Sequence, residues 1–214
     1  MFAVTVIVGL AFLFVVYKLM SAPAAPAITA DSPEALPGGV DVLNATLWDV
    51  KKGGVFTITG FNSDYDDADL IVDQVDRIGQ GGRVVSRELK IHHEGRERWI
   101  SVEKSGGSVS VSVTEPKSPR LSELGLDEDR LAEMDESQAG EFDWDGTTWS
   151  YTGSGERFWF ENDGRQSEGF YYWEFESADG ERYLSMSKFE GEPFEVSLSR
   201  ALGDEHEISI LKVA

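Results

Sequence analysis

A repeated pattern constrains this chain more than any other feature of its sequence. Residues 171–198 match residues 87–113 in a fixed order, with one extra residue in the later segment. Glu88 aligns with Glu174, and the glycines of the turns align as well. A fixed-order match of this length indicates a duplicated structural unit. We therefore expect two related units in one chain.

Both copies have the residue alternation of short antiparallel strands. The clearest example is SVSVSV at residues 108–113, where valines should face inward and serines outward. Gly-rich turns separate such segments, so we predict a mainly β fold of two small antiparallel barrels or sandwiches. The expected strands are 55–60, 70–78, 83–92, 99–104 and 108–113, then 148–153, 157–161, 171–176, 182–188, 194–199 and 207–213. We expect the first strands of the two sets, VFTITG at 55–60 and TWSYTG at 148–153, to be equivalent to each other.

These strands divide the body of the chain into a first β repeat at 41–117 and a second at 138–214. Residues 118–137 between them predict a helical connector, with Ser118 as its N-cap and Gly125 splitting it into two short pieces. Five apolar side chains form a stripe that should pack on a sheet. They are Leu121, Leu124, Leu126, Leu131 and Met134.

The first 20 residues are apolar and carry no charge before Lys18, which predicts a transmembrane anchor. Residues 21–40 are rich in Pro and Ala and predict an extended linker. The alternative is a signal peptide cleaved within residues 21–27, but it lacks a basic start. Lys18 follows the apolar run, so the positive-inside rule favours an inner-membrane protein with a cytoplasmic body.

The formal charge of −20 argues against nucleic acid as a partner, because such binding needs clustered Lys and Arg. We interpret the acidic surface mainly as a solubility feature rather than a docking surface. The chain has no cysteine, which excludes disulfides, thiolate metal sites and a Cys nucleophile.

Several short motifs resemble the bacterial domain of unknown function DUF4178. They are Trp173-Glu174, Asp179-Gly180, Tyr183-Leu184-Ser185 and LSELGL at 121–126. The resemblance covers residues 47–211 and implies a domain that is often duplicated. It brings no enzymatic activity with it. Genes of that family lie near genes for phage-shock-protein-A-like membrane-stress proteins, for polyamine synthesis and for small membrane proteins. The resemblance therefore implies a membrane-tethered accessory protein or scaffold.

The sequence predicts neither a metal site nor a cofactor. His92 and His93 are adjacent on an expected strand, so their side chains should point to opposite faces. The acidic loop at residues 62–69 lacks the Gly and Glu that an EF-hand calcium loop requires. We read it as a solvated loop.

Three tryptophans, Trp144, Trp159 and Trp173, stand out in the aromatic second repeat as a possible interaction surface. Such residues stack on sugar rings in carbohydrate-binding proteins, but they also fill the cores of small β units. Because aromatic side chains bury a large area each, we favour the core interpretation.

Glu88 and Glu174 recur at one position of the repeat and join the tryptophans in the possible interaction surface. A pair of carboxyl groups such as Glu174 and Glu176 would suit glycoside hydrolysis, but no second element is seen to hold them against a sugar. We expect structural hydrogen bonds from the two glutamates to a turn or to Arg98 and Arg182.

These observations lead us to expect a non-enzymatic, membrane-anchored scaffold or interaction protein, accessory to bacterial envelope maintenance. Residues 1–20 would contact the membrane, and a phage-shock-protein-A-like protein is the expected partner. The alternative is an exported, anchored carbohydrate-binding module.

Overall fold

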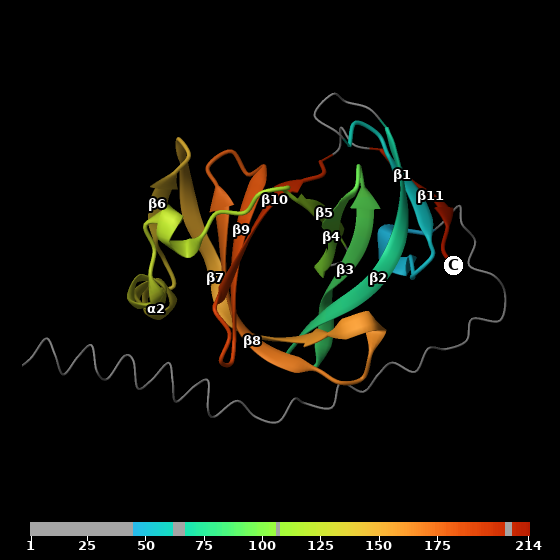
Figure 1. Cartoon of the computed structure of the whole chain (residues 1–214). Coiled ribbons are helices and arrows are strands. Elements are labelled where there is room, and N and C mark those ends of the chain that lie inside the picture. Colours follow the sequence, from blue (N-terminus) through green and yellow to red (C-terminus); the bar gives the residue numbers. More distant parts are fainter. Residues whose placement is uncertain (1–44, 62–66, 106–107, 204–206) are drawn as a thin grey trace, which may run out of the picture. The chain divides into compact units, whose positions relative to one another are not determined.

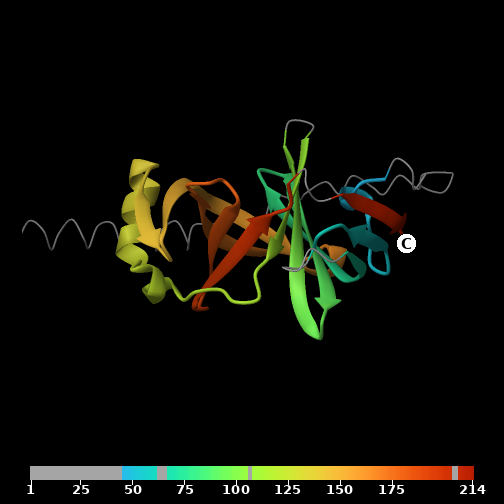
Figure 2. The same cartoon turned by 90° about the horizontal axis from the view of Figure 1, so that it is seen from above.

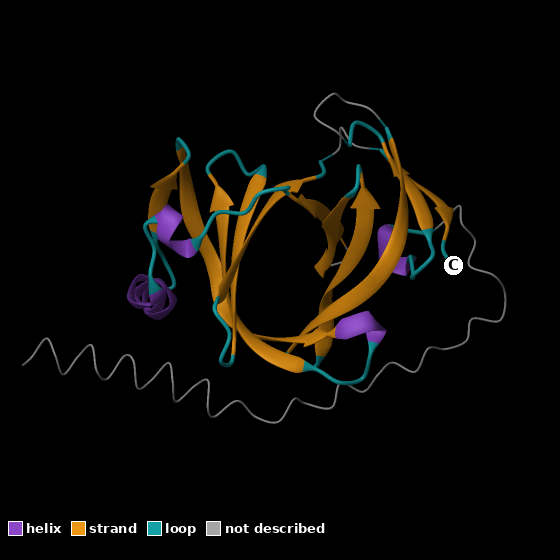
Figure 3. Ribbon diagram, in the orientation of Figure 1, coloured by secondary structure: helices purple, strands orange, loops and turns teal. Residues whose placement is uncertain are grey.

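The computed structural model describes residues 45–61, 67–105, 108–203 and 207–214. Strands dominate these residues (Figure 1, Figure 3). They are β1 (Val55–Ile58), β2 (Ala68–Gln80), β3 (Arg83–His93), β4 (Arg96–Ser105), β5 (Ser108–Thr114), β6 (Glu141–Trp144), β7 (Thr147–Phe160), β8 (Glu168–Ser177), β9 (Arg182–Phe189), β10 (Phe194–Ala201) and β11 (Ile208–Lys212). The helical elements are η2 (Leu47–Asp49), η3 (Leu121–Leu124), α2 (Glu128–Ser137) and η4 (Glu161–Asp163). The expected mainly β fold is confirmed.

The predicted anchor at 1–20 and linker at 21–40 lie outside the described residues. Within the described part, α2 has ten residues, and no helix there combines the length and hydrophobicity needed to cross a bilayer.

The chain forms two compact units. The α2 unit contains residues 117–157 and 168–198, and the β1 unit contains the described residues of 27–116 together with 158–167 and 199–214. Strands β7 and β10 each begin in the α2 unit and end in the β1 unit. The units therefore differ from the predicted repeats at 41–117 and 138–214, because the end of the chain returns to the first strands.

The β1 unit is an antiparallel sheet in the order β11-β1-β2-β3-β4-β5. The last residues of β10 extend it beside β5, and the last residues of β7 pair with the end of β2. One face of this sheet carries a hydrophobic core that η2 covers through Leu47. Phe56, Ile58 and Leu89 in this core are fully buried. Ile208 and Ile210 pack against it, which explains why β11 joins this unit.

The α2 unit has the strand order β10-β9-β8-β7-β6 and a separate hydrophobic core. Helix α2 lies beside β6 and β7 in both views (Figure 1, Figure 2). Leu131 and Met134 of this helix are buried against Trp149 and Trp173. Aromatic side chains thus fill this core, as the sequence predicted.

Most of the prediction for residues 118–137 is confirmed, because this connector contains two short helical pieces. Gly125 ends η3 in a left-handed conformation with φ 70° and separates it from α2. The apolar stripe of the connector packs into the core of the α2 unit. The predicted N-cap of the first piece was wrong: Arg120 precedes η3, and Ser118 Oγ instead accepts a hydrogen bond from Leu198 N. Asp127 caps the second piece, α2, by accepting a hydrogen bond from Arg130 N.

Two hairpins pair in the same register at the positions that the repeat aligns. Glu88 lies opposite Ser101 in the β3–β4 hairpin, and Glu174 lies opposite Ser185 in the β8–β9 hairpin. The alignment of the first strands was wrong, however. TWSYTG forms part of the 14-residue strand β7, which also includes the expected strand 157–161.

Truncation of a buried residue of α2 tests its packing. We expect Leu131→Ala to reduce the free energy of unfolding by about 2–5 kcal/mol, because it leaves a cavity in the core. Urea unfolding followed by tryptophan fluorescence measures this. The neighbouring Arg130→Ala removes an exposed pair with Glu133 and should cost less than about 0.5 kcal/mol. Equal losses for the two variants would contradict the described packing.

Candidate functional site

The most unusual polar cluster lies where β2 pairs with β3 in the β1 unit. There Asp76 is directly opposite Glu88, and Arg77 is directly opposite Arg87. Like charges facing each other across two strands destabilise a sheet unless other groups bind them. Asp76, Arg87 and Glu88 are all buried, so each needs a partner inside the protein.

Asp163 of η4 supplies the negative charge for the two arginines. Its Oδ1 lies 3.0 Å from Arg77 Nε in an ion pair, and its Oδ2 lies 3.4 Å from Arg87 Nη2. Arg77 Nη2 also donates to the carbonyl oxygens of Asp163 at 3.1 Å and Gly164 at 2.7 Å. Arg87 Nη1 donates to the carbonyl oxygen of Trp48. One carboxylate thus holds two guanidinium groups.

Asp76 is bound from the same short element. Its Oδ1 accepts a hydrogen bond of 2.7 Å from the backbone N–H of Asn162, and Gln74 Nε2 donates to both carboxylate oxygens at 2.9 and 3.1 Å. Burial raises the pKa of Asp76, and the nearby charges of Glu161 and Asp163 raise it further. The hydrogen bonds from Asn162 and Gln74 lower it. Asp76 is therefore a buried acid whose charge is costly to keep. We call Asp76, Arg77, Arg87, Asn162 and Asp163 the charge clasp.

The clasp holds its own backbone in an unusual conformation. Asn162 and Asp163 have φ values of 52° and 54°, which lie in the left-handed region that non-Gly residues rarely adopt. Such residues persist when surrounding contacts fix them. Here Arg77, Arg87 and Asp76 provide those contacts. Burial also lowers the pKa of Arg87, while Asp163 opposes that shift.

The two recurring glutamates have structural partners, but not the expected ones. Glu88 accepts hydrogen bonds from Ser86 Oγ at 2.7 Å and Ser101 Oγ at 2.9 Å. Arg98 instead donates to the carbonyl oxygen of Thr114 at 2.8 and 3.0 Å.

In the α2 unit, Glu174 pairs with Arg157 of β7 rather than with Arg182. The Arg157 guanidinium also lies 3.7 Å from the ring centroid of Tyr172, which gives a cation–π contact. Arg182 donates to Thr147 Oγ1 at 2.6 Å. The candidate carboxylate Glu174 is thus part of an ion pair.

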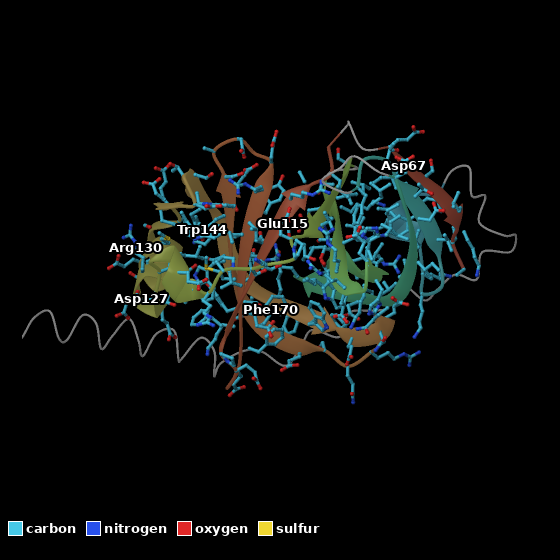
Figure 4. The ribbon with its side chains drawn as sticks, turned by 45° about the horizontal axis from the view of Figure 1, so that its top comes forward. Asp67, Glu115, Asp127, Arg130, Trp144 and Phe170 are labelled. Atoms are coloured by element: carbon cyan, nitrogen blue, oxygen red, sulfur yellow. The ribbon has the colours of Figure 1, made fainter. Side chains whose placement is uncertain are left out.

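The three candidate tryptophans lie in different networks. Trp173 is 4% exposed in the core of the α2 unit, and its Nε1 donates to the carbonyl oxygen of Leu131. Trp144, labelled in Figure 4, is half-buried with its ring centroid 6.1 Å from that of Trp149. Trp159 belongs to the β1 unit, where its ring meets Trp99 edge to face at 5.9 Å. The core interpretation fits Trp173 best.

The histidines and the acidic loop form no metal cluster within the described ranges. His92 Nδ1 lies 2.6 Å from Asp73 Oδ2. The ring of His93 packs edge-on against that of Phe61, with the ring centroids 5.2 Å apart. Residues 62–66 of the acidic loop lie outside the described residues. Asp69, which follows them, accepts a hydrogen bond from Thr57 at 2.6 Å.

The charge clasp was not predicted from the sequence, although the sequence contains a signal for it. Asp76-Arg77 and Arg87-Glu88 place charges at successive positions of two strands that also carry core residues. Charges on both faces of a strand indicate that one of them is buried and needs a partner.

The fold and the cluster define an antiparallel β protein whose buried charges bind one another. The chain belongs to the family described as Domain of unknown function (DUF4178), which matches residues 59–203. The resemblance found in the sequence is thereby confirmed. No curated protein and no solved structure matches the chain. The matched region spans both predicted repeats and includes the charge clasp, but neither β1 nor β11.

Removal of one charge tests the clasp. We expect Asp163→Asn to lower the free energy of unfolding by about 1–3 kcal/mol, because two guanidinium groups then lose their carboxylate. Asn tolerates the left-handed backbone, so the change isolates the charge. Asp145→Asn, in an exposed turn with φ 52°, serves as the matched control and should have little effect. Equal stability of the two variants by urea unfolding would contradict the clasp.

The raised pKa of Asp76 predicts a pH dependence. The folded protein binds this proton more tightly than the unfolded chain, so the contribution of Asp76 to stability grows as the pH falls through its folded pKa. Asp76→Asn keeps an acceptor for Asn162 N–H without the charge. We expect it to be more stable than the wild type at pH 7, with the difference shrinking toward acid pH. Thermal unfolding across pH measures this, and a variant less stable at pH 7 would contradict it.

Proposed function

We propose that the protein is a non-catalytic, membrane-anchored interaction module that is accessory to envelope maintenance. The observation that carries this proposal is that the charged candidate residues are bound by other side chains of the protein. Glu88, Glu174 and Asp163 all bind serine or arginine side chains of their own unit. Carboxylates held in this way are typical of groups that stabilise a fold. The family match adds no catalytic residue.

The proposed anchor is the apolar segment at residues 1–20, with the body on the cytoplasmic side. We also infer that the chain contains a duplicated β segment. In each half a short strand and a long strand precede three antiparallel strands, first β1 to β5 and then β6 to β10. The identical register of the β3–β4 and β8–β9 hairpins supports this inference.

The carbohydrate-binding alternative has less support. Stacking on a sugar ring needs an accessible indole face. Trp173 is buried and its Nε1 is bound to Leu131. Trp144 packs beside Trp149. These contacts favour a core role for the aromatic residues of the α2 unit.

The test is affinity purification of the full chain from native membranes after chemical crosslinking. We expect a phage-shock-protein-A-like protein to be recovered with it. A chain without residues 1–20 keeps the folded body and is the matched control, for which recovery should fall at least tenfold. Equal recovery of that protein with and without the anchor segment, or none with the full chain, would contradict the proposal.

A further inference from the structure

Strand β11 forms an edge of the β1 unit's sheet. In the described residues it pairs with β1 and is the last strand in the hydrogen-bonding order. Thr59 donates its backbone N–H to the carbonyl oxygen of Glu207, and hydrogen-bonding direction alternates along a strand. The backbone groups of Ile208 and Ile210 therefore point away from β1. They offer the donors and acceptors that an added strand would use.

Apolar side chains flank this edge on the outer surface of the sheet. Ile71 of β2 and Leu211 of β11 are 57% and 55% exposed, and they are the two most exposed large apolar side chains among the described residues. Val55 of β1 lies directly opposite Ile71 and pairs with Lys212 of β11. Leu211 thus lies exposed on the edge strand itself, while Ile71 lies two strands further into the sheet. An edge strand with an exposed apolar side chain is a typical template for another strand.

The charged residues along β11 would complement those of a second, antiparallel copy of the same strand. Glu207 lies exposed at the start of β11, and Lys212 lies exposed at its end. The exposed Lys51 also belongs to this end, because its N–H donates to the carbonyl oxygen of Val213. Two antiparallel copies of the strand would bring the acidic start of each beside the basic end of the other. This charge complementarity selects a second copy of the chain as the occupant.

We propose that β11 pairs antiparallel with β11 of a second copy about a two-fold axis, so that the β1-unit sheets of the two chains continue into each other. Such isologous contacts are the commonest in homo-oligomers. Because the outward groups belong to even-numbered residues, a register with Ser209 opposite Ser209 is allowed, and the proposed dimer has this register. Leu211 gains cover in the dimer, because it lies on the pairing strand itself. The edge lies outside residues 59–203, so this contact is a feature of the present chain.

A cysteine crosslink tests the contact directly, since the chain has no cysteine of its own. Ser209→Cys places one thiol near its symmetry mate, at a separation that suits a disulfide. The full chain in detergent should form at least tenfold more disulfide-linked dimer under mild oxidation than Ser110→Cys. Ser110 is an exposed serine of β5 and is the matched control. Equal yields would overturn the proposal, as would a crosslink of Ser209→Cys to a different protein without any homodimer.

A charge exchange provides a second test that does not depend on crosslinking. At about 0.15 M salt the Debye length is about 8 Å, so distant repulsion is screened while contacting charges still act. Lys212→Glu should weaken dimerisation about fivefold in sedimentation, because each dimer loses two ion pairs. Glu207→Lys should act alike, and the double variant should regain the wild-type affinity. A wild type that stays monomeric, or a double variant no stronger than the single ones, would overturn the proposal.

Discussion

The bonds between Asp163 and two arginines are the interaction on which the described fold depends most. They allow β2 and β3 to pair although Arg77 faces Arg87. Asn162 completes the arrangement by binding Asp76. The segment that supplies these groups connects β7 to β8, most of which belong to the α2 unit. The clasp thereby binds residues 158–167, which interrupt the α2 unit in sequence, to the sheet of the β1 unit.

Each unit relies on its own core in addition to this polar arrangement. The β1 unit buries aliphatic residues and phenylalanines beneath η2, whereas the α2 unit buries tryptophans and tyrosine against its helix. Large aromatic side chains supply much buried area from few residues, which suits a small unit. The aromatic composition of the second half is therefore explained by packing.

Much of the architecture could be predicted from local patterns. Alternating residues and Gly-containing turns located nearly every strand, and Gly125 marked the break between η3 and α2. The N-cap of η3 was misplaced, because Ser118 binds the backbone of Leu198, which is distant in sequence, and η3 begins only after Arg120. Partners of Glu88 and Glu174 were also missed. Ser86 and Ser101 bind the first and Arg157 binds the second, from the same or the neighbouring strand. Alignment of the two repeats carries no information about such contacts.

The sequence by itself determined most of the strands and the helical connector, because these depend on neighbouring residues. Only the tertiary structure decided how the charges meet. Counting back from the turn at Gly81 would place Asp76 opposite Arg87, an ordinary ion pair. An irregularity between Ile78 and Gly79 shifts the register by one residue and opposes like charges instead. Since Asp163 of η4 then binds both arginines, the clasp depends on a bulge that local patterns do not reveal.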